Sequence, residues 1–299
     1  MKALYQKFYY FALLLLCSIM MSCDGPGWKD GEGVIIFLDS PTVSPDGTRI
    51  AFNFQLSGDT TNSSYPLPGL YIASINGTGE KFLFRNSGTF CWSIDGKKIA
   101  TGKGIYTIEN DIVKNFRPKS SEIPIFQISD WSPDGKTLLG FSETKVYLCD
   151  TLFQNIRELP ITVFAPRWMP DGNHIIGEMW SSEWMYSEIA ITDTLCSNIV
   201  RLTHRTVTDW VWYFTPAPSP DGSMIALNKS RTTIYVMNPD GSNLQFLTGG
   251  RYPAWTPDSK YIVYSKKTEG DGEVFHSYIW KISIDGKEKI QITNNHKIK

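Results

Sequence analysis

Short apolar stretches alternate with polar turns along nearly the whole chain. Six times, an apolar stretch, a turn of almost constant sequence and a second apolar stretch follow one another. The copies are VSPDGTRIAF at 43–52, WSIDGKKIAT at 92–101, WSPDGKTLLG at 131–140, WMPDGNHIIG at 168–177, PSPDGSMIAL at 218–227 and WTPDSKYIVY at 255–264. Proline presets φ in such a turn, aspartate accepts local hydrogen bonds, and glycine relieves the strained last position. The pattern therefore predicts six tight β-hairpins.

A second pattern follows every hairpin. An alternating apolar stretch, a polar turn and another short strand recur, as in GLYIASINGTG at 69–79 and TIYVMNPDG at 233–241. Each unit is thus predicted to be a four-stranded antiparallel sheet, and the turn aspartates recur every 37 to 50 residues, which suits one blade each. Long apolar patterns of helical period do not occur in any unit, so we expect almost no helix.

Six such sheets can bury their flat faces only against one another. A single sheet of this size is marginally stable in water, whereas packing face to face around an axis forms a β-propeller. The sequence therefore predicts an all-β fold, a six-bladed β-propeller of four-stranded antiparallel blades. The tryptophans before four turns, Trp92, Trp131, Trp168 and Trp255, are predicted to pack between blades. Two modes of ring closure stay open, namely pairing of 34–38 with the sixth blade or ordinary blade-to-blade packing.

The SPDG units resemble the WD40-like (PD40) repeats of the TolB propeller family. Five of the six copies keep the Pro-Asp pair; the second has Ile94 in place of proline, and the sixth has Ser259 in place of glycine. The resemblance covers nearly all of the chain after residue 34 and implies the fold. TolB itself has an additional amino-terminal α/β domain, whereas here only the predicted tether of about ten residues is expected between Cys23 and the first blade, so the resemblance does not carry over TolB's role.

The amino terminus is typical of a bacterial lipoprotein. Lys2 and Lys7 form a positive region before an apolar run that is too short to span a bilayer comfortably, and Met-Met-Ser-Cys at 20–23 resembles a lipobox. We predict a signal peptide over 1–22, lipidation of Cys23, a flexible tether over 23–33 and the TolB-like propeller over 34–299. An ordinary cleaved signal peptide is the alternative. Either leader places the protein in the bacterial cell envelope, facing the periplasm or the cell surface, with the lipid as its membrane contact.

Composition narrows the range of partners. The formal net charge is -1, and the chain contains no long run of Lys or Arg, so nucleic acid is not an expected partner. Three cysteines remain after Cys23, namely Cys91, Cys149 and Cys196. Their spacing fits no zinc pattern, Cys91 is expected to be buried, and no disulfide is predicted between Cys149 and Cys196.

Variable connections are predicted on one face of the disc, where the loops between second and third strands and between successive blades lie. Loops on a rigid scaffold commonly carry binding residues. The connections of the fourth and fifth blades hold a group of aromatic residues that we take as candidate contacts for a partner: Trp180, Trp184, Tyr186, Trp210, Trp212 and Tyr213. Because strand residues alternate, either Trp210 and Trp212 or Val211 and Tyr213 should face inward and only pack the core.

A second candidate site is a polar mouth of the central channel. Arg85, Arg167 and Arg251 each lie just before or within a predicted inner strand, and Asp209 and Glu183 could join them. Solvation of a water-filled pore is the alternative role of these residues.

Catalytic residues are not predicted. GxSxG and HExxH motifs are absent from the sequence, and His174, His204, His276 and His296 show no metal-ligand spacing. His204 and His276 fall near the variable face as weak candidate ligands. We therefore expect no cofactor and no metal, and a non-catalytic propeller that binds an envelope protein or glycan through its loop face. The alternative function is a small lyase or hydrolase that acts in the channel on polysaccharide or peptide.

Overall fold

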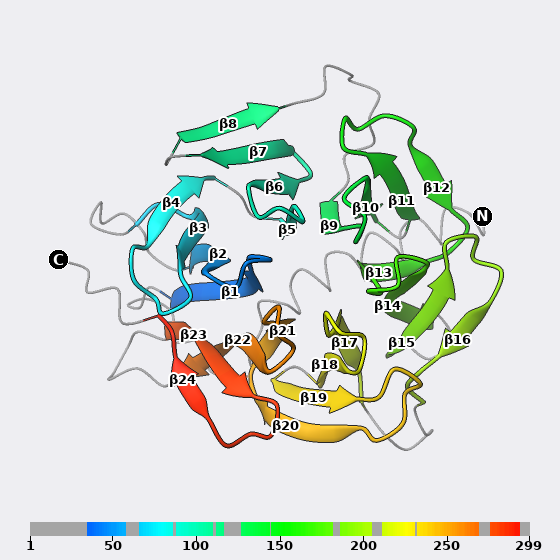
Figure 1. Cartoon of the computed structure of the whole chain (residues 1–299). Helices are drawn as coiled ribbons and strands as arrows, with labels where there is room; N and C mark the ends of the chain where they lie inside the picture. The colour runs from blue at the N-terminus through cyan, green and yellow to red at the C-terminus, as the bar shows by residue number, and fades with distance from the viewer. Residues whose placement is uncertain are drawn as a thin grey trace. The chain divides into compact units, whose positions relative to one another are not determined.

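The computed structural model is an all-β ring of six blades. It describes residues 35–57, 66–85, 88–109, 112–116, 127–143, 145–181, 186–204, 211–230, 232–268 and 276–293. Six four-stranded antiparallel sheets surround a common axis (Figure 1). The described residues include no helix that is long and apolar enough to cross a membrane. The predicted six-bladed β-propeller is confirmed. The predicted lipid attachment at Cys23 and the tether lie outside the described residues.

Each blade runs from an inner strand to an outer strand in chain order. Blades 1 and 2 comprise β1 (Ile35–Val43), β2 (Arg49–Ser57), β3 (Gly69–Ser74), β4 (Lys81–Phe84), β5 (Phe90–Trp92), β6 (Lys98–Thr101), β7 (Gly104–Glu109) and β8 (Ile112–Phe116). Blades 3 and 4 comprise β9 (Gln127–Trp131), β10 (Thr137–Ser142), β11 (Lys145–Asp150), β12 (Arg157–Leu159), β13 (Val163–Trp168), β14 (His174–Ser181), β15 (Tyr186–Asp193) and β16 (Ile199–Arg201). Blades 5 and 6 comprise β17 (Tyr213–Pro218), β18 (Ile225–Lys229), β19 (Thr233–Met237), β20 (Gln245–Gly249), β21 (Arg251–Trp255), β22 (Tyr261–Thr268), β23 (His276–Ser283) and β24 (Lys289–Gln291).

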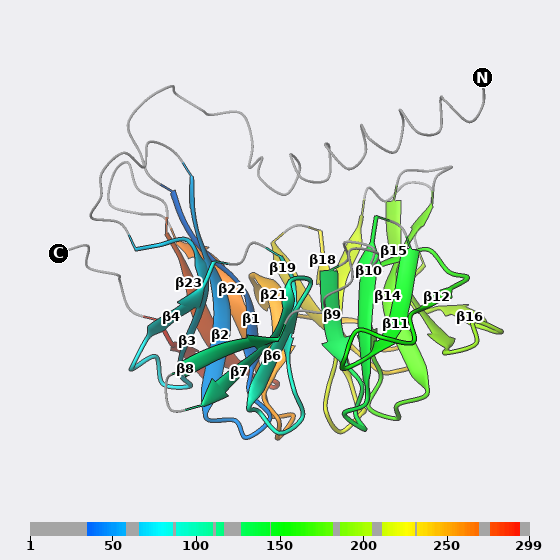
Figure 2. The same ribbon diagram turned by 90° about the horizontal axis from the view of Figure 1, so that it is seen from above.

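The repeated turn between the first two strands folds as its residues dictate. In blade 1 the Asp46 carboxylate accepts hydrogen bonds from the Ser44 hydroxyl at 2.5 Å and from the Thr48 backbone N–H at 3.0 Å. Gly47 has a positive φ of 71°, which a glycine adopts without strain. These turns lie along the lower edge of the disc in Figure 2. We call this side the turn face and the opposite side, with the longer connections, the loop face.

One apolar cluster fills each of the six interfaces between neighbouring blades. Trp92, Trp131, Trp168 and Trp255 are only 7–8% exposed and belong to four of these clusters, as the repeat predicts. Burial of apolar surface between blades, rather than within one sheet, therefore holds the ring together.

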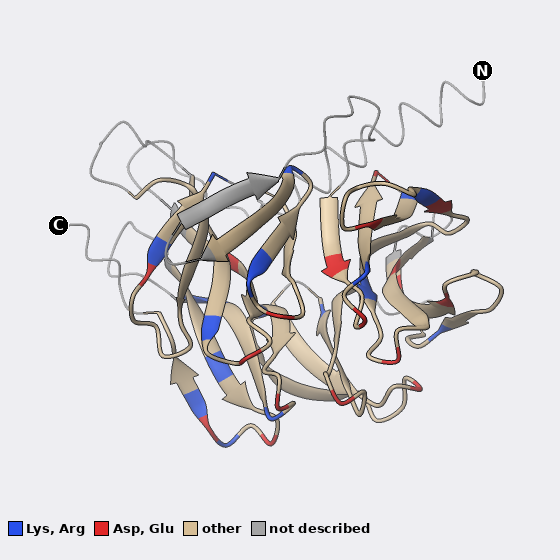
Figure 3. Cartoon of the chain, turned by 45° about the horizontal axis from the view of Figure 1, so that its top comes forward, with Lys and Arg blue, Asp and Glu red and all other residues tan. Residues whose placement is uncertain are grey.

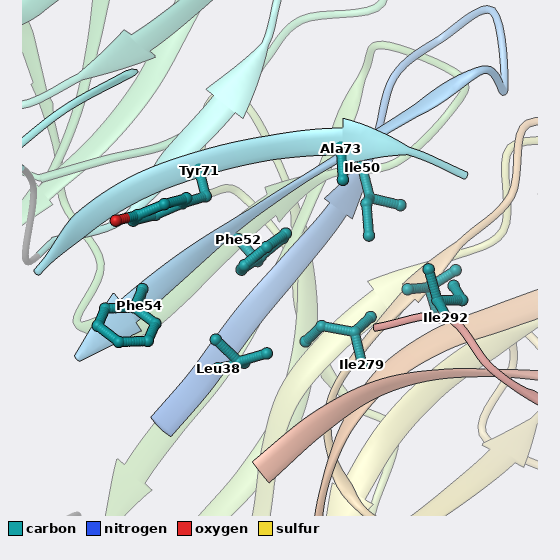
Figure 4. Close-up of a cluster of buried hydrophobic side chains, with 9 residues drawn as sticks. Leu38, Ile50, Phe52, Phe54, Tyr71, Ala73, Ile279 and Ile292 are labelled. Carbon is teal, nitrogen blue, oxygen red and sulfur yellow. The ribbon is translucent and has the colours of Figure 1, made fainter. Parts of the chain in front are cut away.

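The ring closes through the first strand. Ile36 of β1 pairs in parallel with His276 of β23, and the Leu38 N–H donates to the Ser277 hydroxyl at 2.6 Å. The Ser265 hydroxyl of β22 donates to the Leu38 carbonyl at 2.5 Å. Of the two closures left open by the sequence, pairing of the amino-terminal strand with blade 6 is the one observed. Figure 4 shows the apolar side of this junction, where residues of blade 1 face Ile279 and Ile292 of blade 6.

The cysteines in the described part of the chain form no disulfide. Cys91, Cys149 and Cys196 are free thiols, and Cys91 is buried between blades 2 and 3 as expected. Burial raises the pKa of Cys149 to about 12, which keeps this thiol protonated and unreactive at neutral pH.

Candidate functional site

Four inner strands share an irregularity near the loop face. Ser40, Ala165, Thr215 and Tyr252 each have a positive φ of 45–56° and each precedes a proline. The strand register shifts at each of these points. Proline is tolerated in a strand at such bulges and at sheet edges. A bulge changes the direction of the following side chains, which would otherwise alternate between the two faces of the sheet. The inner edge of the ring is thereby shaped to present particular polar groups.

The bulges of blades 5 and 6 bond to the blade before them. The Thr215 N–H donates to the Glu178 carboxylate of β14 at 2.6 Å, and the Tyr252 N–H donates to the Asn228 side-chain oxygen of β18 at 3.1 Å. Asn228 also donates its amide to the Gly250 carbonyl at 2.9 Å. Glu178 and Asn228 occupy equivalent positions on the second strand, because each pairs with the residue before a bulge. A polar side chain at this position thus locks one blade to the next.

Glu178 and Asp39 are half-buried carboxyl groups close to the strand bulges. Burial raises the pKa of Glu178 to about 7, which the Thr215 N–H partly offsets. Burial also raises the pKa of Asp39 to about 6, against the lowering effect of hydrogen bonds from Ser40 and Asn53. Both groups therefore titrate near neutral pH, where an ordinary carboxyl group is fully ionised.

Tyr252 links these two acids. Burial and the charges of Asp39 and Glu178 together raise the pKa of its phenol to about 12, against the lowering effect of Arg251. Asp39 lies on blade 1, Glu178 on blade 4, and Arg251 and Tyr252 on blade 6. We call these four residues the inner polar cluster. Three blades thus contribute groups within electrostatic reach of one phenol.

A third acid, Asp130, lies between blades 3 and 4. The Asp130 carboxylate accepts hydrogen bonds from the Trp131 N–H at 2.9 Å and from the Trp168 N–H at 2.8 Å. Burial raises its pKa, while the neighbouring Arg167 guanidinium lowers it. Arg167 also donates to the Ser129 carbonyl. The Asp130 and Arg167 pair therefore has a clear structural role in joining the two blades.

Of the three arginines predicted at the mouth of the channel, two lie on inner strands. Arg167 and Arg251 lie on the inner strands β13 and β21 and are half-buried, whereas Arg85 follows the outer strand β4 and is exposed. Glu183 and Asp209 lie outside the described residues. Figure 3 shows acidic and basic segments interspersed over the propeller rather than gathered in one patch.

Three of the six candidate aromatic residues can be placed. Tyr213 is 6% exposed and packs in the cluster between blades 4 and 5, so its position is that of a core residue. Val211 packs against the same cluster. Trp212 is half-buried, and its ring lies 6.5 Å from that of Phe214. Of the two alternating sets, Val211 and Tyr213 therefore face the core, and Trp212 does not share their side of the strand.

Trp180 lies near the loop-face end of β14. Its side chain is half-buried. Because strand residues alternate, Trp180 lies on the same face of β14 as Glu178 and Ile176, and Ile176 packs against blade 5. The hydrogen bond from Thr215 to Glu178 ties this strand end to the one that follows Trp212. Trp180 thus lies on β14, and Trp212 directly precedes β17, which this hydrogen bond joins to β14. Trp184, Trp210 and the side chain of Tyr186 lie outside the described residues.

Asp39, Asp130, Glu178 and Tyr252 were not predicted from the sequence. A polar residue in an antiparallel strand ordinarily faces solvent, so it gives no signal by itself. Residues before proline in the inner strands, as in Ser40-Pro41 and Tyr252-Pro253, were the available signal for the bulges. Within the described part of the chain, no group of three or more His, Cys, Asp or Glu side chains is arranged to hold a metal ion.

Comparisons with known proteins agree on the fold. Models of protein families give no match to the sequence, and neither do the curated proteins. Among solved structures, TolB from Acinetobacter baumannii aligns with a TM-score of 0.61 at 18% identity, over 86% of this chain and 63% of that one. The chain thus spans less than two thirds of that protein.

Two further structures align over most of their own length. A protein assigned as TolB from Agrobacterium tumefaciens gives a TM-score of 0.56 at 21% identity, over 75% of this chain and 87% of that one. An oligogalacturonate lyase in complex with manganese gives a TM-score of 0.54 at 10% identity, over 88% and 79%. At these identities the likeness concerns the fold, which is a TolB-like β-propeller.

Proposed function

We propose that this chain is a lipid-anchored, non-catalytic propeller of the bacterial envelope that binds a protein or glycan partner through its loop face. The observation that carries the proposal is the position of Trp180 and Trp212. Both residues are half-buried, Trp180 at the loop-face end of β14 and Trp212 directly before β17, while the neighbouring Tyr213 fills the core. Partly exposed tryptophans on a rigid scaffold offer large contact area at low entropic cost, to an apolar protein surface or to a sugar ring.

Partner capture tests the loop face. Tagged full-length protein, its Trp180→Ala/Trp212→Ala variant and a Leu195→Ala/Phe246→Ala variant are used to recover partners from envelope extract and to probe a glycan array. The control removes apolar side chains that are 74% and 59% exposed on blades 4 and 5, outside the proposed contact. We expect the first variant to lose the partner and the control to keep it. Equal recovery by all three proteins would refute the loop-face site.

The lipid anchor has its own test. We expect the wild-type protein to fractionate with membranes and to incorporate labelled palmitate, and Cys23→Ala to do neither. A Cys196→Ala variant controls for loss of a thiol, because Cys196 is a free cysteine of the propeller. Membrane association of Cys23→Ala equal to that of the wild type would remove the anchor from the proposal and leave the binding face standing.

The inner polar cluster favours one alternative function, a lyase or hydrolase acting on polysaccharide or peptide. Asp39 and Glu178 titrate near pH 6 and 7, which is the range in which a carboxyl group can both accept and donate a proton. Product release from oligogalacturonate or a peptide library, abolished by Glu178→Gln or by a chelator, would establish catalysis. His204→Ala tests the remaining histidine candidate. Lack of turnover by the wild type supports binding alone.

A further inference from the structure

Two lysines lie beside one tryptophan where blades 5 and 6 meet. The Lys266 ammonium of β22 lies 5.7 Å from the centre of the Trp280 ring of β23, and the Lys289 ammonium of β24 lies at the same distance from it. Lys289 is also 5.9 Å from the centre of the Tyr264 ring. Figure 1 shows β24 and β20 as the outer strands of these neighbouring blades. Two cations from different strands thus converge on one indole ring.

The register of blade 6 places these side chains on one face of its sheet. Tyr264 pairs with Trp280, and Trp280 pairs with Gln291, two residues after Lys289. Because paired residues share a face and every second residue returns to it, Lys266 and Lys289 lie on that face as well. Tyr264 and Trp280 pack in the apolar cluster between blades 5 and 6, so the face is turned toward blade 5. Lys289 is exposed and Lys266 is half-buried, so the pair remains accessible from solvent.

The positive charge of this pair is not balanced by an acid. Within the described part of the chain, neither Lys266 nor Lys289 has a carboxylate partner. Burial lowers the pKa of Lys289, the neighbouring charge of Lys266 lowers it further, and no described acid raises it. Glu288 is the acid nearest in sequence, and it accepts a hydrogen bond from the Tyr261 hydroxyl at 2.6 Å. Two like charges therefore lie close enough to repel one another.

The surroundings hold the lysines in place with neutral groups. The Lys289 ammonium donates to the buried Thr248 hydroxyl of β20 at 3.1 Å, which ties blade 6 to blade 5. Burial raises the pKa of the Tyr264 phenol, and the nearby Thr248 hydroxyl lowers it. The indole N–H of Trp280 is buried and has no acceptor in the described part of the chain. Donors thus exceed acceptors at this rim, and each ammonium retains N–H groups for a ligand.

We propose that Lys266 and Lys289 form a binding site for a phosphoryl group, carried by a small phosphate monoester or by free phosphate. A phosphoryl group has close to two negative charges at neutral pH and three acceptor oxygens, so it neutralises both ammoniums and bonds to each. A carboxylate has one charge and leaves one lysine unbalanced. Lysine binds phosphate as a point charge, which needs no planar fork. The site uses none of the aromatic residues assigned to the loop face.

Calorimetric titration of the full-length protein tests the site. The probes are inorganic phosphate, glycerol 3-phosphate and acetate, each at the same ionic strength, because salt screens such contacts. We expect both phosphates to bind saturably and acetate to bind at least tenfold more weakly. Equal affinity for the two phosphates assigns recognition to the phosphoryl group alone, and tighter binding of the ester adds its organic part; either result supports the site. Acetate that binds as tightly as phosphate, or no saturable binding of either phosphate, would overturn the inference.

Charge-removing variants connect the binding to the lysine pair. Lys266→Met and Lys289→Met keep an aliphatic stem beside the indole, and each should weaken phosphate binding about tenfold, as loss of one charged hydrogen bond implies. Lys281→Met is the matched control. Lys281 lies on the opposite face of β23, 4.5 Å from the centre of the Tyr261 ring, and its variant should bind phosphate as the wild type does.

Urea denaturation separates loss of binding from loss of folding. In phosphate-free buffer the Lys266→Met and Lys289→Met proteins should be as stable as the wild type, because neither change removes an ion pair. Added phosphate should stabilise the wild type and Lys281→Met against urea, and have less effect on the other two variants, since a ligand stabilises the state that binds it. Phosphate affinity that is unchanged in both Lys266→Met and Lys289→Met, or equally reduced in Lys281→Met, would contradict the site.

Discussion

Two neighbouring interfaces of this propeller are built from the same strand positions, but one is closed by a cation over an indole ring and the other contains a groove. Between blades 1 and 2, Arg49 lies 5.0 Å from the Trp92 ring and donates to the Gly96 carbonyl at 2.7 Å. Between blades 2 and 3, Lys98 and Trp131 occupy the equivalent positions and line a groove. The planar guanidinium both stacks and hydrogen-bonds, whereas an ammonium is a compact hydrated charge that does not cover an indole.

This difference separates residues that build the propeller from residues that vary between its blades. Residues that keep the repeat, such as the turn aspartates and the interface tryptophans, build the blades and close the ring. Residues at positions that the repeat does not fix, such as Lys98 and the acids Asp39, Asp130 and Glu178, line recesses or place polar groups. These variable positions are therefore the candidates for binding.

The largest expected effect comes from a matched pair of isoleucines. Ile72 of β3 faces blade 2, and Ile105 at the same register of β7 faces blade 3. Ile72→Ala should lower the free energy of unfolding by about 4 kcal/mol, because the deleted atoms leave a cavity among the packed side chains between blades 1 and 2. Ile105→Ala should cost about 2 kcal/mol, since this residue already borders the groove. Urea denaturation of both variants measures the difference, and equal losses would contradict it.

Glu178 extends the comparison to the interface of blades 4 and 5. Its pKa of about 7 in the folded protein exceeds its ordinary value of 4.5, so folding takes up a proton between these values. The contribution of Glu178 to stability should therefore be greatest below about pH 4.5, fall as pH rises, and level off above pH 7. Glu178→Gln, which keeps the acceptor for the Thr215 N–H, should gain on the order of 2 kcal/mol over the wild type at pH 8.

Thermal unfolding from pH 5 to pH 8 measures this effect. Glu158→Gln is the control, because that side chain is 48% exposed and forms a surface ion pair with Lys145. A Glu178→Gln protein that keeps the slope of the wild type against pH would show that another group titrates.

A smaller effect separates the two cations. Arg49→Ala should lose about 1 kcal/mol, because it removes a hydrogen bond and a cation–π contact at a partly exposed site. Lys98→Ala should change the free energy of unfolding by no more than about 0.5 kcal/mol, as for an ordinary surface substitution. Parallel denaturation curves of the two variants give the measurement. A Lys98 loss as large as that of Arg49 would mean that the lysine also bridges two blades.

The sequence predicts most of the fold because the same hairpin motif recurs six times along the chain. The turn aspartate and the alternating strands recur in all six copies, and the interface tryptophan recurs in four, so the number of blades follows. Ring closure stayed open because VIIFL at 34–38 is compatible with either partner, and the choice depends on hydrogen bonds between residues 38 and 277. Asp130 and Glu178 were missed because their environments depend on contacts with the next blade, to Trp168 and Thr215. In the aromatic group, alternation left two assignments, and packing of Tyr213 between blades 4 and 5 decides between them.

The most direct test of the central claim, that the loop face binds the partner, is photo-crosslinking in living cells. A photoreactive phenylalanine analogue at Trp212 is compared with the same analogue at Ser223, in the turn of blade 5 on the opposite face. The account predicts a discrete crosslinked product from position 212 and none from position 223. Crosslinking from position 223 with none from position 212 would contradict it.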